Sequence, residues 1–437
     1  MYALKRRFFG PGEQSPGNHL RFGLLGLPNS GKSTLFNALM DPVRPVSAEN
    51  FLFTTLETTI GSGGECPDSR IDWLGGLFKA EVVTRVPFSL IDGPGIVHGS
   101  FAGAGEGLDF LPKYRDVEVF IHVLRGYDSD EISHYENSTV DPVRDAKAVV
   151  NELMRYDFEE IDARLRRMET QLEQMKKDFT PIGRHMLVEV RTLTKCWECL
   201  LGQDRMQLTE EQKSGLRRKG KSLEIRIEAP AVLGGVPLRY ATWTPIELEV
   251  LKKFNFFSTK EMVYVLNVTA RDFLRGHSKW SPILREALDK DMGGGQVLSI
   301  SCAFEWSMRV HARNGTLRHY FDANPQHQDA HKERGVASLL YACTRALDLV
   351  TFYTLNDDTR EFKAWFCRQG TNIKDAAALM DYQLYKTFQR GQTFAYDDIV
   401  EYNGDFDLLN EFGKHRHQVK SYIITDGDTV TFTSYRK

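Results

Sequence analysis

The sequence predicts an α/β protein: a doubly wound domain interrupted by an antiparallel helical hairpin and followed by a small β-grasp-like domain. Three observations support this fold class. Apolar strands and a glycine turn open residues 19–140, an apolar repeat typical of coiled coils follows from about residue 141, and short alternating strands fill residues 351–437. A chain of 437 residues, 41% hydrophobic and 26% charged, is long enough for two or three cores and is neither disordered nor collagenous.

Charge and cysteine content restrict the partners and the compartment. The 56 Lys and Arg residues nearly balance 59 Asp and Glu residues, so a net charge of -3 gives no global basic field for nucleic acid or membrane. Six scattered cysteines fit free thiols in a reducing compartment, and we expect a cytoplasmic protein. No apolar run reaches the roughly 20 residues of a membrane-spanning helix. Residues 1–18, rich in Gly and Pro, predict a flexible tail, with a transit peptide as the alternative.

The first predicted elements have the order strand, turn and helix. Leu20–Gly26 is an apolar run of the kind that is buried in a covered parallel sheet, a glycine-rich turn follows it, and Ser33–Met40 predicts a helix. This order is the first half of a βαβ unit. Further buried strands are predicted at Val86–Ile91 and Val117–Leu124, and together these elements predict the doubly wound domain.

A helical hairpin is predicted for residues 141–225, because apolar residues recur there at alternating spacings of four and three. They are Ile161, Leu165, Met168, Leu172 and Met175 in one stretch and, beyond Pro181 and Gly183, Leu187, Val190, Leu193, Trp197 and Leu200 in the next. Two such seams cover each other in an antiparallel pair. Strands return at Met262–Leu266 and Gln296–Ile300, so we expect the hairpin to be inserted in a domain made of residues 19–140 and 226–310.

The remaining chain divides into a connecting segment and a small β domain. Residues 311–350 are polar and end in a helical run, Val336–Leu349. Short strands separated by turn residues then predict a β-grasp-like module over residues 351–437. These strands are Lys363–Cys367, Gly391–Ala395, Ser421–Ile424 and Thr429–Phe432.

The segment Gly26–Ser33 reads G-x-x-x-x-G-K-S and lies between the predicted strand and helix, where a phosphate-binding loop occurs. Its glycines let successive backbone N–H groups point at the α- and β-phosphates, and the helix N-terminus adds positive potential. Lys32 would neutralise the β- and γ-phosphates, and the Ser33 hydroxyl would bind Mg²⁺. The nucleotide-binding candidates in this loop are Asn29, Ser30, Gly31, Lys32, Ser33 and Thr34.

A second magnesium ligand is predicted at Asp92, which follows a buried strand in the pattern Asp92-x-x-Gly95. The carboxylate can hold the Mg²⁺ shell, and the Gly95 N–H can sense the γ-phosphate. Thr55 is placed to be the mobile-loop threonine that completes the metal coordination in the triphosphate state. Thr54 is its rival, and a plain turn threonine is the alternative.

From about Leu20 to its end, the chain resembles the Obg-like ATPases, also called YchF, a family among the translation-factor-related P-loop proteins. The resemblance rests on GLPNSGKSTLFNAL from Gly26, IDGPGIVHGS from Ile91, VDPVRDAKAVVNEL from Val140, VPLRYATWTPIELEVL from Val236, MVYVLNVTARDF from Met262 and YIITDGDTVTF from Tyr422. It implies a P-loop NTPase domain of the OBG type with an inserted helical arm and a C-terminal TGS domain.

Base recognition is where the sequence departs from this family. GTPases read guanine with Asn-Lys-x-Asp, whereas the family has Asn-x-x-Glu, which goes with a preference for ATP. Here the motif is Asn267-Val268-Thr269-Ala270, and Ala270 offers no carboxylate for a bidentate guanine contact. Asn267 can still contact the N7 and N6 edge of a purine, and the resemblance places Ser301, Cys302 and Ala303 in the base-contact loop. We therefore expect ATP to be favoured, with GTP as the alternative.

Hydrolysis is expected to be slow or to depend on a partner. Ile96 occupies the position at which Ras-type enzymes place a glutamine that orients the attacking water, and an aliphatic side chain cannot do this. The catalytic candidates are Lys32, His98 in the same loop and His122, which lies in a predicted strand at a position where family members also tend to carry His. The alternatives are an exposed loop residue for His98 and a satisfied core histidine for His122.

Other features leave their alternatives open. Gly99–Gly107 would be a flexible switch or a plain surface loop. Cys196-x-x-Cys199 is a single pair inside a helical seam and gives little support for zinc. The basic run Lys213–Lys221 would meet RNA phosphates or form a solvated face. Asp381 and Gln383 stand where the family has His and Asp in its TGS domain, which puts an inherited RNA surface there in doubt.

These observations predict a Mg²⁺-dependent, slowly hydrolysing ATP-binding switch whose arm and TGS domain relay the nucleotide state to a partner such as the ribosome. The rivals are an RNA- or ribosome-binding adaptor that holds nucleotide structurally, an NTPase that uses both ATP and GTP, and a metabolic phosphotransferase. The oligomeric state is not predicted.

Overall fold

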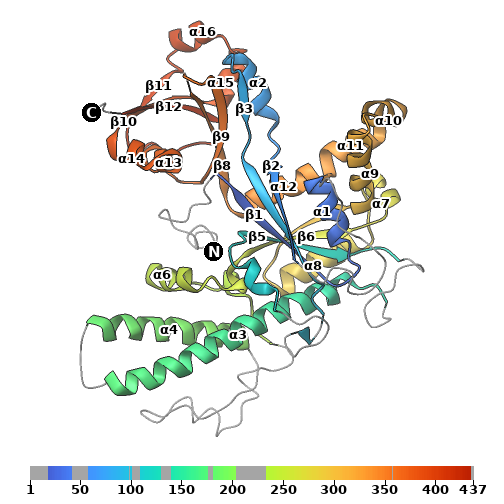
Figure 1. The fold of residues 1–437 in the computed structure, drawn as a ribbon, viewed down its shortest axis with the longest axis vertical. Helices are drawn as coiled ribbons and strands as arrows, with labels where there is room; N and C mark the ends of the chain where they lie inside the picture. Colours follow the sequence, from blue (N-terminus) through green and yellow to red (C-terminus); the bar gives the residue numbers. More distant parts are fainter. Residues whose placement is uncertain are drawn as a thin grey trace. The chain divides into compact units, whose positions relative to one another are not determined.

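The computed structural model describes residues 18–41, 58–97, 99–100, 109–128, 139–175, 181–202, 233–356 and 358–434 (Figure 1). Within these residues, the chain divides into two compact units. The first takes in Gly23–Thr59 and Ile91–Ala330, and the second takes in the described residues up to Phe22, Ile60–Leu90 and His331–Lys437. The predicted tail, apart from Asn18, lies outside the described residues. None of the described helices is long and apolar enough to cross a membrane.

The first sheet has the strand order β2-β4-β1-β5-β6-β7. Its strands are β1 Leu20–Leu25, β2 Thr59–Glu65, β4 Pro87–Asp92, β5 Val119–Arg125, β6 Glu261–Asn267 and β7 Gln296–Ile300. Strands β5, β6 and β7 run parallel, and every residue of β5 is buried, as expected of a strand covered on both faces. The five strands that the sequence predicts for this region are present, with ends that differ from the prediction by at most two residues.

The predicted helical hairpin consists of α3 Pro142–Met175 and α4 Pro181–Leu201, which lie side by side (Figure 1). Phe158 of α3 stacks on Trp197 of α4, with ring centroids 5.4 Å apart. Pro181, predicted to interrupt the apolar pattern, is the first residue of α4, a position where proline needs no N–H partner. The hairpin is an insertion between β5 and β6, which are direct neighbours in the sheet.

The buried Asp157 of α3 fixes the hairpin to the domain. Its carboxylate accepts hydrogen bonds from the backbone N–H of Phe257 at 2.9 Å and of Ser258 at 2.6 Å, just before β6. The other helical elements of the first unit are α1 Lys32–Met40, η3 Leu111–Tyr114, η6 Leu238–Tyr240, α6 Pro245–Phe254, η7 Phe257–Thr259, α7 Ala270–Arg275, α8 Trp280–Asp291, α9 Cys302–Arg313, α10 Leu317–Ala323 and α11 Pro325–Arg334. Two of them, α10 and α11, occupy a stretch that the sequence showed only as polar.

The second sheet has the strand order β11-β10-β12-β8-β9-β3. Its strands are β3 Val82–Thr84, β8 Leu349–Asn356, β9 Glu361–Arg368, β10 Phe388–Phe394, β11 Arg416–Gln418 and β12 Asp428–Ser434. The helices of this unit are α2 Ser69–Leu77, α12 Val336–Ala346, α13 Ile373–Met380, α14 Tyr382–Thr387, α15 Tyr396–Glu401 and α16 Phe406–Glu411. Strand β3 pairs in parallel with β9, although far removed from it in sequence.

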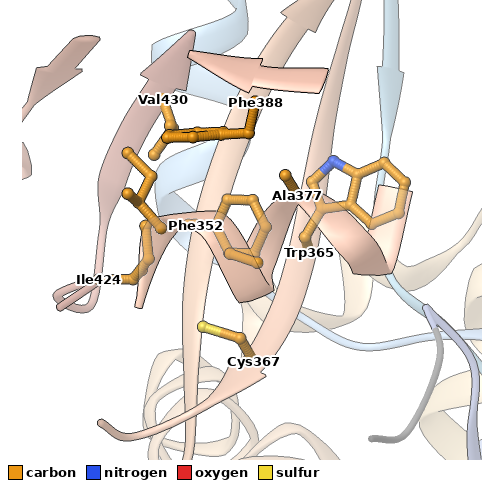
Figure 2. Close-up of a cluster of buried hydrophobic side chains, with 9 residues drawn as sticks. Phe352, Trp365, Cys367, Ala377, Phe388, Ile424 and Val430 are labelled. Atoms are coloured by element: carbon orange, nitrogen blue, oxygen red, sulfur yellow. The ribbon is translucent and has the colours of Figure 1, made fainter. Parts of the chain in front are cut away.

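An apolar cluster between this sheet and α13 forms the core of the second unit (Figure 2). Phe352 of β8 is fully buried at its centre, beside Trp365 of β9 and Phe388 of β10. Ala377 contributes the small side chain of α13 that lets the helix approach these rings. The indole N–H of Trp365 donates to Thr354 at 2.9 Å, so this ring is buried without an unpaired donor.

In the second unit, one predicted helix is shorter than expected and one predicted strand is wrong. The helix predicted to reach Leu349 ends at Ala346, because Asp348 adopts a left-handed φ of 52° and Leu349 begins β8. Ser421–Ile424 is not a strand, and only Ile423 forms an isolated bridge. The backbone around it is satisfied by the start of α13 instead, since Ile424 N–H donates to the carbonyl of Thr371 at 3.0 Å.

Candidate nucleotide-binding site

The loop between β1 and α1 has the backbone that its glycines require. Gly26 has φ 149° and Gly31 has φ 102°, in a region where other residues are strained. A Cβ on Gly26 would lie 2.3 Å from the carbonyl oxygen of Val123, and one on Gly31 would lie 2.3 Å from the side-chain nitrogen of Asn267. Only glycine fits at either position, so the curled loop follows directly from the motif. Asn29, between them, has φ 59°.

Lys32 lies at the start of α1 with its ammonium turned back onto the loop. It donates to the carbonyl oxygens of Gly26 at 3.3 Å and Leu27 at 3.0 Å. Burial lowers the pKa of Lys32 to about 8, and the negative charge of Asp92 opposes this shift. The loop therefore holds a buried ammonium close to the helix N-terminus, the arrangement that attracts phosphate oxygens.

Ser33 and Asp92 are brought together from α1 and the end of β4. The Ser33 hydroxyl donates to Oδ2 of Asp92 at 2.7 Å. The other carboxylate oxygen, Oδ1, is buried without a hydrogen-bond partner, and so is the Ser30 hydroxyl. Burial raises the pKa of Asp92, while the Lys32 charge and the Ser33 hydroxyl lower it. A hydroxyl and a carboxylate with an unsatisfied oxygen are the donor set that Mg²⁺ prefers, so these residues fit the ion.

The segment after Asp92 packs closely against the phosphate loop. A Cβ on Gly95 would lie 2.5 Å from the backbone nitrogen of Pro28, so glycine is required here for close approach. The next N–H, that of Ile96, donates to the Gly26 carbonyl at 3.1 Å. The Ile96 side chain is fully buried. At the position where Ras-type enzymes carry a water-orienting glutamine, this chain therefore has a buried apolar side chain.

Asn267, at the end of β6, ties the phosphate loop to the start of α9. Its side-chain nitrogen donates to the Ser30 carbonyl at 3.0 Å, and its Oδ1 accepts from the Cys302 N–H at 3.1 Å. The sequence suggested Asn267 only as a contact to the purine. Its bridging contacts join residues more than thirty positions apart, and no local pattern in the sequence points to them.

The other predicted base-side residues lie around this bridge. The Val268 N–H donates to the Ile300 carbonyl at 2.9 Å, and the Ser301 hydroxyl caps α9. Cys302 and Ala303 lie in the first turn of α9 rather than in an open loop, and burial raises the pKa of the Cys302 thiol.

Ala270 is exposed at the first position of α7 and has no carboxylate. The Thr269 hydroxyl caps this helix by accepting from the N–H of Asp272 at 3.1 Å, and it donates to the Asp272 carboxylate at 2.9 Å. Asp272, an acidic residue in the first turn that sequence reasoning did not single out, is thus engaged in the cap.

His122 is fully buried in the middle of β5. Burial, together with the positive charges of Lys32 and Arg239, lowers the pKa of His122 to about 3, so the imidazole is neutral at physiological pH. Both of its ring nitrogens lack a hydrogen-bond partner, so it is not the satisfied core histidine that the sequence offered as the alternative.

Several predicted residues have other placements. Thr34 lies half-buried in the first turn of α1. Thr54, Thr55, His98, most of Gly99–Gly107 and the basic run Lys213–Lys221 lie outside the described residues. Cys196 and Cys199 of α4 are free, and within the described chain no three His, Cys, Asp or Glu side chains cluster as metal ligands. Asp381 caps α14 by accepting from the Gln383 N–H at 2.9 Å.

Comparisons with known proteins follow the same division of the chain. Residues 21–165 match a family described as 50S ribosome-binding GTPase, and residues 349–434 match the YchF-GTPase C-terminal family, described as a protein of unknown function. Obg-like ATPase 1 of Caenorhabditis elegans is 31% identical over 421 residues, which cover 95% of this chain and 92% of that protein. Obg-like ATPase 1 of Homo sapiens is 30% identical over 416 residues, with the same coverage, 95% and 92%.

The solved structure of the Schizosaccharomyces pombe YchF GTPase has a similar fold. It matches 97% of this chain and 100% of its own, with a TM-score of 0.68 at 24% sequence identity. The predicted fold class, with a P-loop domain and a separate C-terminal domain, is thereby confirmed. By its sequence relatives and by its phosphate loop, the chain belongs to the Obg-like ATPase (YchF) family of P-loop nucleotide hydrolases.

Proposed function

We propose that this chain is a Mg²⁺-dependent, ATP-binding switch that hydrolyses ATP slowly and acts with a translation partner. The observation that carries the proposal is the placement of Lys32, Ser33 and Asp92 around one curled loop, with one Asp92 oxygen buried and unpaired. An ammonium, a hydroxyl and a carboxylate at a helix N-terminus are suited to a triphosphate with its metal. Asn29, Ser30, Gly31, Thr34 and Gly95 are the proposed neighbours of the phosphates.

Magnesium would be held by Ser33 and Asp92, with Thr55 as the proposed third residue. Bound there, the ion supplies positive charge to the phosphate oxygens. Ser33 and Asp92 are already in contact at 2.7 Å, so the chain has brought the two ligands together in advance. Titrating ATP with and without EDTA tests this: weaker binding without Mg²⁺ supports the site, and an unchanged affinity contradicts it.

The preference for ATP rests on the base side of the site. Asn267 uses one amide hydrogen and its oxygen to hold the loops together, which leaves one amide hydrogen for a purine. Ala270 is exposed and has no carboxylate to accept from guanine. Val268, Ser301, Cys302 and Ala303 are the proposed walls of the base pocket. Equilibrium affinities for ATP and GTP test this, and tighter binding of GTP by tenfold would refute it.

Slow hydrolysis follows from the apolar contact at Ile96. Without a polar group there, nothing in the described part of this segment orients a water molecule. His122 stays a proposed candidate for positioning water, because its imidazole is neutral and both of its ring nitrogens lack a hydrogen-bond partner. His98 remains the candidate in this loop, and Lys32 is the proposed charge stabiliser.

A ribosomal partner is proposed from the description of the matching family and from the presence of the arm. Single-turnover phosphate release, measured with and without ribosomes, tests it. Faster release with ribosomes supports the switch. Release in neither case supports the second candidate, an adaptor that holds ATP structurally, which the buried Ile96 favours.

A further inference from the structure

A second group of buried polar side chains lies in the first unit, on β5, β6 and η6. His122 and Tyr264 have no exposed surface, and Arg239 is 6% exposed. Both ring nitrogens of His122, the Tyr264 hydroxyl and the Nε and Nη2 atoms of Arg239 are buried without a hydrogen bond of standard geometry. Arg239 is nevertheless close enough to the Tyr264 hydroxyl to interact with it. Buried polar groups are nearly always satisfied, so an unpaired set in one region points to a missing partner.

The three side chains are neighbours. His122 and Tyr264 face each other in the register of the parallel pair β5 and β6, with ring centroids 5.5 Å apart. Burial raises the pKa of the Tyr264 hydroxyl, and the nearby charge of Arg239 opposes that rise. The Tyr264 ring packs directly against Gly295, where a Cβ would lie 2.6 Å from it. Arg239 is held over the Tyr240 ring at 4.7 Å.

The charges of this group are unbalanced. Within the described residues, no Asp or Glu forms a close ion pair with Arg239, although the negative charge of Glu261 is near enough to act on its pKa. The Lys32 ammonium is close enough to His122 to lower its pKa further, so positive charge is present on two sides of the ring. A buried guanidinium is costly unless an anion pairs with it.

We propose that Arg239, Tyr264 and His122 form a buried binding site for a small monovalent anion such as chloride. Arg239 and Tyr264 supply N–H and O–H donors, and the neutral imidazole supplies one more N–H. Donors outnumber acceptors, and the positive charges of Arg239 and Lys32 face the single nearby carboxylate of Glu261, so an anion satisfies the group better than water does. The near-complete burial of all three side chains restricts the ligand to a small ion. The site adjoins the nucleotide contacts through Lys32, but it rests on its own residues and does not depend on the proposed function.

Crystals of the full chain grown with sodium bromide test the site directly. We expect an anomalous bromide peak within hydrogen-bonding reach of the Arg239 guanidinium and the Tyr264 hydroxyl. An ordered water at this place, or no ordered density, would overturn the proposal.

Thermal unfolding in solution provides the second test, without nucleotide and at constant ionic strength, with chloride exchanged for gluconate. We expect chloride to raise the Tm of the unsubstituted chain by about 2–4 °C. Tyr264→Phe, which removes only the hydroxyl, should lose most of this dependence, and Arg239→Met should lose it altogether. If the Tm of Tyr264→Phe depends on chloride as strongly as that of the unsubstituted chain, the halide binds elsewhere, for example at the phosphate loop. That result would overturn the proposal.

Tyr353→Phe is the matched control, because its hydroxyl is bonded to Asp68 in the second unit. It should keep the chloride dependence of the unsubstituted chain. If Arg239→Met does not fold, the comparison of Tyr264→Phe with Tyr353→Phe still decides the question. A bromide peak in the crystal without any chloride dependence in solution means binding at crystal concentration only and overturns the proposal.

Discussion

The backbone N–H of Gly99 donates a hydrogen bond of 2.9 Å to Oε1 of Glu152, a fully buried residue of α3. Gly99 follows the segment in which Gly95 and Ile96 contact the phosphate loop. Glu152 lies in the first half of the helical hairpin. The bond therefore connects the segment beside the nucleotide site to the hairpin, and it offers a direct route by which one can influence the other.

Replacing Glu152 tests the strength of this connection. Glu152→Ala leaves the Gly99 N–H without its acceptor and also removes the ion pair with Arg155, so we expect the free energy of unfolding to fall by about 1–3 kcal/mol. Urea unfolding measures it. Glu249→Ala, on the exposed face of α6, is the control and should change stability by less than about 0.5 kcal/mol. Equal effects of the two substitutions would show that the Gly99 contact is not stabilising.

Lys32→Met should abolish triphosphate binding and yet stabilise the nucleotide-free chain. At pH 7 it removes a buried ammonium whose pKa burial lowers from 10.5 to about 8, so we expect about 1–3 kcal/mol of added stability. Calorimetric titration with ATP and urea unfolding check the two parts. Retained ATP affinity would contradict the proposed site.

The pH dependence of stability should reveal the same group. The folded chain releases the Lys32 proton at a lower pH than the unfolded chain, so this residue makes stability rise with pH between about 8 and 10.5. Because burial also lowers the pKa of Lys260 to about 8, the informative quantity is the difference between the unsubstituted chain and Lys32→Met. A flat difference over this window would show that Lys32 is not perturbed.

Asn267→Ala should weaken both folding and nucleotide binding. It leaves the Ser30 carbonyl and the Cys302 N–H without their side-chain partners, and we expect a loss of about 2–4 kcal/mol. Asn267→Asp keeps an acceptor for the Cys302 N–H but turns a carboxylate oxygen toward the Ser30 carbonyl. Because these two oxygens repel each other, we expect its loss of stability to be at least as large as that of Asn267→Ala. Thermal unfolding and ATP titration of both variants check this. Unchanged stability in Asn267→Ala would refute the bridging role.

Ala270→Asp should shift base preference toward GTP. The substitution places a carboxylate at the first position of α7, where the helix dipole favours it, and restores the group that accepts from guanine. We expect the ratio of GTP to ATP affinity to rise about tenfold. Ala270→Asn, which has the same shape without the charge, is the control. If the ratio of GTP to ATP affinity is the same in the unsubstituted chain, Ala270→Asp and Ala270→Asn, the nucleotide base does not bind next to residue 270.

Much of the site was predictable because its rules are local. Gly26, Gly31, Lys32 and Ser33 lie within one turn and one helix start, and their spacing alone predicts a curled loop before a helix. The hairpin was predictable for the same reason, since the spacing of its apolar residues is set by the helical repeat. The irregular backbone of Ser421–Ile424 was not predictable, because its hydrogen-bond partners lie near Thr371, far away in sequence.

The amino-acid order by itself determined the phosphate loop, the inserted hairpin and the family, all of which depend on residues close together in the chain. Tertiary structure alone decided that Asn267 bridges two loops, that Gly95 must be small against Pro28, and that His122 is buried and uncharged. These properties arise where strands and loops distant in sequence meet. The burial and the hydrogen-bond partners of these residues depend on which segments become neighbours in the fold. The local periodicity of the sequence does not specify these neighbours.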